Sequence, residues 1–168
     1  MHADCCLLHK KRELIRDGQR VKVDSGIAEL LLHVWGQGIE TEAACEADQT
    51  SVRIGFHSRA HAYLIFPDTH SLLSFLRVAE GERAVRQVIK YMEQKHPNRR
   101  NQLHLSNGWR VHWSGSGSSR MLDFPPEEIP AIVDRFLRSN LSLDRGCGEE
   151  LPADIATHGE AVRGHGIC

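Results

Sequence analysis

The stretch from Ile27 to Trp35 carries apolar residues at the spacing of an α-helix. Five apolar positions fall at i, i+3, i+4, i+7 and i+8, one stripe of a helix surface: Ile27, Leu30, Leu31, Val34 and Trp35. Asp24 or Ser25 is expected to cap the first amide groups. Gly36 and Gly38 then offer the left-handed backbone at which helices end.

Residues 39–45 alternate between two faces, which predicts a strand. The odd-numbered positions share one face and the even-numbered positions share the other. This strand places Cys45 and Glu46 at its end, where side chains can leave the core and contact a ligand.

Further strands are predicted at residues 52–56, 62–66 and 121–124, where apolar and polar residues alternate or an apolar run precedes proline. Residues 64–67 read Leu-Ile-Phe-Pro, and residues 122–125 read Leu-Asp-Phe-Pro. Each tetrapeptide leads into an expected helix. The similarity suggests a weak internal repeat of a strand-Phe-Pro-helix unit.

Pro67 stands where proline is tolerated, at the start of a helix, and Asp68 or Thr69 follows as its cap. This helix is expected to stop near Gly81. A second helix follows, because the apolar residues between positions 85 and 92 form one stripe.

Helices are also expected towards both ends of the chain. Residues 4–17 are interpreted as a helix with Asp4 as its N-cap and Gly18 just past its end. The last helix is opened by residues 125–128, and its apolar stripe runs from Ile129 to Leu137.

Residues 101–113 predict a β-hairpin whose register depends on the length of its loop. A three-residue loop, Ser106 to Gly108, puts the apolar side chains on one face: Leu103, Leu105, Trp109, Val111 and Trp113. A two-residue loop would mix both faces, so burial favours the longer loop. Trp109 and Trp113 are then expected to be buried, and His104 and Arg110 are not.

Together these elements predict the α+β class: a single domain with a mixed or antiparallel sheet of about five strands and helices mainly on one face. The domain is expected to span residues 1–141. Residues 142–168 show little periodicity and are expected to be a flexible C-terminal tail.

The pattern VDxGIxxLLxxVWxxGIxTxxAC, followed by AYLIFPDxxSLLSFL, resembles a family of small uncharacterised bacterial and phage-borne proteins. In that family a helix ending in Leu-Trp precedes a Ser-Cys-Gln-like turn, and an Ile-Glu-Phe-like strand precedes a helix. Here the turn reads Ala44-Cys45-Glu46, and the strand has Ile65 in place of the acidic residue. The resemblance implies a fold and no mechanism.

The chain has 168 residues, 40% of them hydrophobic, and a formal net charge of −1. Its charge therefore gives no general attraction to nucleic acid, and no apolar run is long enough to span a membrane. We expect a cytoplasmic protein, in which the five cysteines are thiols.

The first candidate site surrounds Cys45 and Glu46. A thiol at a strand end could be a nucleophile or a metal ligand, although a free cysteine is often only a small buried residue. The expected pocket has an apolar wall and a polar mouth, in which basic side chains lie over Glu46. The residues of this pocket are Trp35, Cys45, Glu46, His57, Arg59 and His61.

Two other groups of residues are weaker candidates. Cys5, Cys6 and His9 have metal-binding side chains at helical spacing, but zinc sites usually join separate elements. The basic hairpin face, with His104, Arg110 and His112, could bind phosphate, or it could be an ordinary solvated surface.

The leading hypothesis is a small non-enzymatic regulatory protein that binds a small molecule or a protein partner. The alternative is a thiol- or metal-dependent enzyme centred on Cys45 with nearby histidines. A nucleic-acid or phosphate binder ranks third, since the basic face has no stacking aromatic residue. The sequence indicates no particular cofactor, reaction or oligomeric state.

Overall fold

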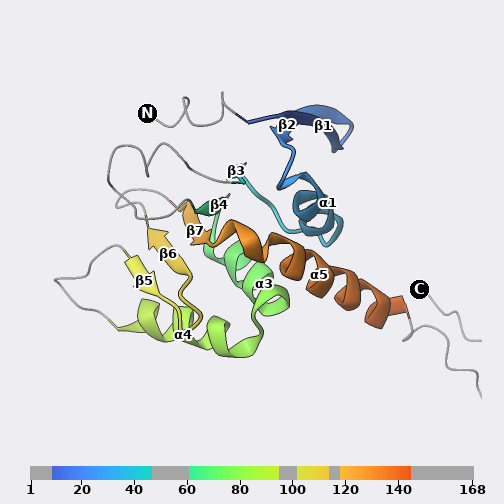
Figure 1. Ribbon diagram of the computed structural model, residues 1–168. Helices are drawn as coiled ribbons and strands as arrows, with labels where there is room; N and C mark the ends of the chain where they lie inside the picture. The colour runs from blue at the N-terminus through green and yellow to red at the C-terminus, as the bar shows by residue number, and fades with distance from the viewer. Residues whose placement is uncertain (1–8, 47–60, 95–101, 114–117, 145–168) are drawn as a thin grey trace, which may run out of the picture.

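The computed structural model describes residues 9–46, 61–94, 102–113 and 118–144 (Figure 1). Within this part of the chain, four α-helices, a two-stranded sheet and a five-stranded antiparallel sheet form one α+β domain, as predicted. None of the helices in the described segments is long and apolar enough to cross a membrane.

The larger sheet has the strand order β3-β4-β7-β6-β5, and every neighbouring pair is antiparallel. Its strands are β3 (Ala43–Cys45), β4 (Ala62–Phe66), β7 (Arg120–Phe124), β6 (Arg110–Trp113) and β5 (Gln102–His104). The β3 strand is shorter than the predicted 39–45 strand. The expected strand at residues 52–56 lies outside the described residues.

One face of this sheet forms the core with the helices. The helices are α1 (Ala28–Gly36), α3 (Thr69–Ala79), α4 (Glu82–Glu93) and α5 (Ile129–Asp144), the last preceded by the 3₁₀ turn η2 (Pro126–Glu128). Phe75 on α3 connects the layers: its ring centroid lies 5.4 Å from that of Phe66 and 5.5 Å from that of Phe136. Alternate strand residues such as Leu64 and Leu122 are fully buried in the same core.

The two Phe-Pro units are neighbours in the sheet. β4 and β7 pair so that Leu64 lies opposite Leu122, the equivalent residue of the other unit. Each strand leads into a helix, and the two helices, α3 and α5, contact each other. The internal similarity in the sequence therefore coincides with an antiparallel pair at the centre of the fold.

The predicted helix at residues 4–17 is wrong over residues 11–16. The chain instead forms the hairpin of β1 (Lys11–Arg16) and β2 (Gln19–Asp24), near α1 and β3 (Figure 1). Asp17 and Gly18 have φ values of 51° and 76°, the left-handed pair that a two-residue type I′ turn requires. The turn chemistry of Asp-Gly outweighs the weak helical spacing of the flanking residues.

The helix caps were predicted with mixed success. Asp68 caps α3 by accepting a hydrogen bond from the Ser71 amide at 2.7 Å. Neither Asp24 nor Ser25 caps α1: its N-cap residue is Ile27, and no side chain bonds to the first turn. Asp24 is used elsewhere, as described below.

The β5–β6 hairpin has the three-residue loop that burial favours. Leu103 pairs with Val111, the Leu105 amide donates to the Trp109 carbonyl at 2.8 Å, and Gly108 has a φ of 89°. Trp109 is fully buried, whereas Trp113 is half-buried and stacks on Tyr91 with ring centroids 4.9 Å apart.

His104 is exposed, as expected, but Arg110 is not a solvated side chain. Only 17% of it is accessible, because it forms an ion pair with the buried carboxylate of Asp123. At the C-terminus α5 continues to Asp144, and residues 145–168 of the expected tail lie outside the described residues.

Candidate functional site

Three side chains capable of binding a metal converge from three separate segments. His9 precedes β1, Asp24 ends β2, and Cys45 ends β3. His9 Nδ1 lies 2.9 Å from Asp24 Oδ2 and 3.7 Å from Cys45 Sγ. The ligand atoms of all three residues lie within 4.8 Å of one another.

The fold brings these residues together through strand register. In the β1–β2 hairpin Lys11 is opposite Asp24, so the chain just before β1 runs beside the end of β2. β3 lies against β2, and the Glu46 amide donates to Asp24 Oδ2 at 3.4 Å. The cluster therefore forms only when the small hairpin packs against the edge of the larger sheet.

The cluster is withdrawn from solvent. Asp24 and Cys45 are fully buried, and the His9 side chain is 11% exposed. A buried carboxylate must be paired or hydrogen-bonded. Asp24 meets this requirement through His9 and the Glu46 amide on Oδ2 and through the Lys11 ammonium group on Oδ1.

These contacts also determine the ionisation of Asp24. Burial alone would raise the pKa of its carboxyl, but hydrogen bonds from His9, Lys11 and Cys45 outweigh burial and hold the pKa below its usual value of 3.8. Asp24 is therefore a carboxylate at neutral pH, and the Cys45 thiol acts as one of its donors.

Glu46 reaches back across the cluster to the start of α1. Its carboxylate accepts a hydrogen bond from the Gly26 amide, and a Cβ atom at position 26 would overlap that carboxylate. Glycine at this position permits the approach. The expected cover of Glu46 by basic residues is not described, because His57 and Arg59 lie outside the described residues. His61 is half-buried just before β4.

Trp35 is not part of the Cys45 cluster. Its indole N–H donates to Thr41 Oγ1 at 2.9 Å, and the Arg16 guanidinium lies 5.2 Å from the ring centroid. Trp35 instead lines a cavity of about 290 Å³ that Asp24 also borders. Among the described residues, Trp35 lines the cavity and Cys45 belongs to the buried cluster, and Asp24 contributes to both.

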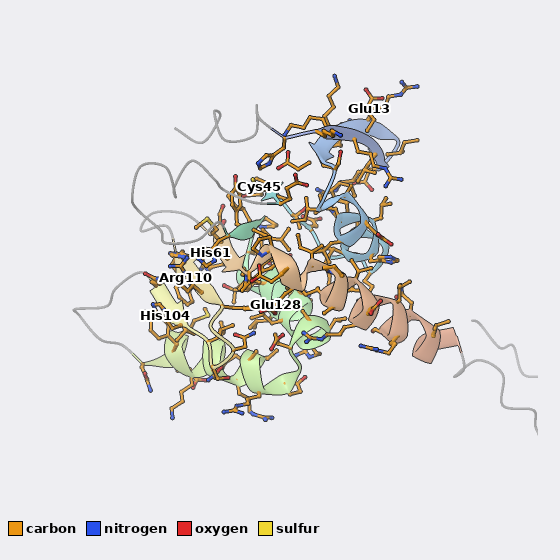
Figure 2. All side chains as sticks on the ribbon, viewed as in Figure 1. Glu13, Cys45, His61, His104, Arg110 and Glu128 are labelled. Atoms are coloured by element: carbon orange, nitrogen blue, oxygen red, sulfur yellow. The ribbon has the colours of Figure 1, made fainter. Side chains whose placement is uncertain are left out.

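A row of polar side chains continues from Cys45 across the whole sheet. Successive cross-strand partners along it are Cys45, Tyr63, Asp123, Arg110 and His104. Figure 2 shows its two ends at opposite edges, with Cys45 on β3 and His104 on β5. This is the sheet face opposite the helix-covered core.

Asp123 occupies the centre of that row and is 5% exposed. Its Oδ2 lies 2.6 Å from Arg110 Nη2, and its Oδ1 lies 2.7 Å from His112 Nε2. Two of the three residues of the predicted basic face, Arg110 and His112, therefore contact the buried carboxylate of Asp123. Sequence reasoning missed Asp123 because it stands within an apolar strand and gives no periodic signal.

Sequence reasoning also missed Asp24 as a site residue and Lys11 as its partner. The signal that identifies them is the Asp17-Gly18 turn, since a hairpin there brings Lys11 opposite Asp24. Of the predicted metal candidates, His9 belongs to the cluster, with partners other than those expected. Cys5 and Cys6 lie outside the described residues.

None of the family models, curated proteins or solved structures compared with the chain matches it. The resemblance to small bacterial and phage-borne proteins stays a prediction.

Proposed function

We propose that this protein binds a divalent transition-metal ion of the zinc class through His9 Nδ1, Asp24 Oδ2 and Cys45 Sγ. The observation that carries the proposal is the convergence of these three atoms within 4.8 Å from three separate segments. The proposal develops the metal-binding part of the alternative sequence hypothesis, a thiol- or metal-dependent enzyme centred on Cys45 with nearby histidines.

The spacing of the ligand atoms suits zinc. Tetrahedral zinc, with bonds of about 2.0–2.1 Å to nitrogen and about 2.3 Å to sulfur, separates these two atoms by roughly 3.6 Å. The Cys45 Sγ–His9 Nδ1 distance is 3.7 Å. Nitrogen and oxygen ligands of the same ion would stand roughly 3.3 Å apart. His9 Nδ1 and Asp24 Oδ2 are 2.9 Å apart, so a shift of a few tenths of an ångström would admit the ion.

The chemistry of the donor set supports the same class of ion. A thiolate selects zinc or copper over magnesium and calcium, which prefer oxygen ligands. Asp24 presents Oδ2 to the cluster while Lys11 binds Oδ1, and ligating carboxylates are commonly held by such a second partner. Three protein ligands leave the fourth position to water or substrate, the arrangement found at catalytic zinc sites.

We also propose a cytoplasmic location, where Cys45 would stay reduced. Cys45 is fully buried, and a reducing compartment keeps such a thiol available as a ligand.

The test is zinc stoichiometry and affinity of purified protein, with Co²⁺ as a spectroscopic substitute whose absorption reports thiolate ligation. Cys45→Ala and His9→Ala are expected to weaken binding at this site at least about tenfold, because each removes a ligand. His104→Ala, an exposed histidine on β5, is the matched control and should bind normally.

Folding of each variant is checked by circular dichroism. The site proposal is wrong if folded Cys45→Ala retains both the stoichiometry and the cobalt–thiolate absorption of the unaltered protein. In that case His9, Asp24 and Cys45 form a hydrogen-bonded group that only stabilises the fold.

A further inference from the structure

The cavity of about 290 Å³ lies between the β1–β2 hairpin, α1 and β3. Its apolar wall includes Val21, Leu31 and Trp35, and three cationic side chains border it: Lys11, Arg16 and Lys22. Ligand pockets combine apolar walls with a few polar groups that fix orientation. The cavity has that composition and does not contain Cys45 or His9 among its lining residues.

The charge around the cavity is net positive, because three cationic side chains and two carboxylates line it. The two carboxylates in its wall already have partners: Asp24 binds Lys11, and Glu42 accepts a hydrogen bond from Ser119 at 2.8 Å. Lys22 is exposed and forms no ion pair with any residue that the structure describes. Its ammonium group is therefore available at the cavity rim.

The backbone of β2 supplies a further donor on the same side. In a hairpin closed by the Arg16–Gln19 pair, hydrogen-bonded and non-hydrogen-bonded pairs alternate, so the Lys22 amide points away from β1. β2 has no other strand partner among the described residues, and β3 lies beyond its free edge. The Lys22 amide therefore points toward β3, and Lys22 is also among the residues that line the cavity.

The apolar wall determines the shape of ligand that fits. Trp35 is half-buried and fixed by its bond to Thr41, and Arg16 covers part of its ring. A fixed aromatic side chain beside two aliphatic residues suits a flat or compact apolar group. A cavity of this volume accommodates a small metabolite rather than a polymer.

We propose that this cavity binds a small organic anion, with its apolar body against Trp35 and its phosphate or carboxylate group at Lys22 and Lys11. The site shares Asp24 with the metal cluster but does not require a bound metal. Because Lys11 contacts both the cavity and Asp24, metal binding would alter affinity for the anion without being required for it.

Isothermal titration calorimetry on the full chain, treated with chelator, tests this proposal with four probes: phenyl phosphate, benzoate, phenol and inorganic phosphate. Phenyl phosphate or benzoate is expected to bind at least fivefold more tightly than phenol and inorganic phosphate. The stronger of the two anions identifies phosphate or carboxylate as the group that the cavity recognises.

Lys22→Met should weaken that binding at least fivefold, and Lys22→Glu should abolish it. Lys10→Met is the matched control. Lys10 directly precedes β1 of the same hairpin, is exposed and does not line the cavity. The proposal is wrong if both Lys22 variants bind the probe as tightly as the unaltered protein. It is also wrong if phenol and phenyl phosphate bind equally, or if none of the four probes binds.

Cys45→Ala separates this proposal from the previous one. It is expected to lose zinc at the cluster while it binds phenyl phosphate with unchanged affinity. Loss of probe binding in a folded Cys45→Ala protein would overturn the independence of the two sites.

Discussion

Asp24 illustrates how much a single side chain can depend on its surroundings. It stands four residues before α1, where the sequence predicts an N-cap, yet its oxygens bond to His9, Lys11 and the Glu46 amide. Those partners come from the β1 side of the hairpin and from the residue that follows β3. Local sequence favours a cap, whereas tertiary contacts make Asp24 the centre of a buried cluster.

Asp68 shows the opposite case, a cap that local sequence predicts correctly. The Ser71 amide donates to its carboxylate and lowers the pKa of Asp68 below 3.8. Because the folded pKa is lower than the unfolded pKa, ionised Asp68 stabilises the protein above about pH 3.8. This contribution is lost as the pH falls through the folded pKa.

We predict that Asp68→Ala lowers the free energy of unfolding by about 1 kcal/mol at pH 7, the usual value of an N-cap. Urea denaturation measures the difference, which should shrink as the pH falls below 3.8. Asp134→Ala, an exposed aspartate within α5, is the control and should change stability little. A pH-independent effect of Asp68→Ala would contradict the capping role of its charge.

At the scale of elements, the β1–β2 hairpin determines whether the cluster exists. Its turn holds Asp17 and Gly18 in the left-handed region, and its register carries Lys11 to Asp24. The same residues were assigned to a helix from sequence, because two competing local signals are present. The hairpin is selected because it buries Leu14 at 5% exposure and leaves Ile15 71% exposed, an alternation that belongs to a strand.

Two glycine substitutions are expected to have opposite effects on stability. Gly18→Ala should cost about 1 kcal/mol, because alanine is strained at a φ of 76°. Gly36→Ala should stabilise by roughly 0.5–1 kcal/mol, because Gly36 lies in α1, lacks a positive φ and has open space around its Cβ position. Urea denaturation of both variants tests the pair; equal changes would mean that the turn is not left-handed.

At the scale of the whole molecule, the helices and both sheets share one continuous core. The core runs from Leu14 on the small hairpin through α1 to the buried face of the larger sheet. Phe75 contacts aromatic rings on β4 and α5, and both candidate sites include residues of β3, which pairs with β4. The sites are therefore expected to unfold together with the core.

Phe75→Ala should lower the free energy of unfolding by about 3–5 kcal/mol, the usual cost of deleting a buried phenylalanine. Leu141→Ala is the control, because Leu141 is 57% exposed on α5. Thermal unfolding should remain a single transition in both variants. A second transition for the β1–β2 hairpin would show that the hairpin is not part of the cooperative unit.

The sequence by itself predicted most elements of the larger sheet and its helices. The stripes of α1, α3 and α5, the Asp68 cap, the alternation in β4 and the three-residue loop at Ser106 all follow from periodicities and turn preferences that act within a few residues. Such local signals suffice where each element buries one consistent face. Cys45 was recognised as a candidate because it ends the predicted strand at residues 39–45.

Only the tertiary structure decided which residues surround Cys45. His9, Asp24 and Cys45 are separated by 15 and 21 residues along the chain, and no periodic pattern connects them. Their meeting depends on the Asp17-Gly18 turn and on the packing of β2 against β3. The same packing separates Trp35 from Cys45 and leaves a cation-lined cavity beside Asp24. Local sequence could not predict this, because strand register and packing determine which side chains of different elements lie close together.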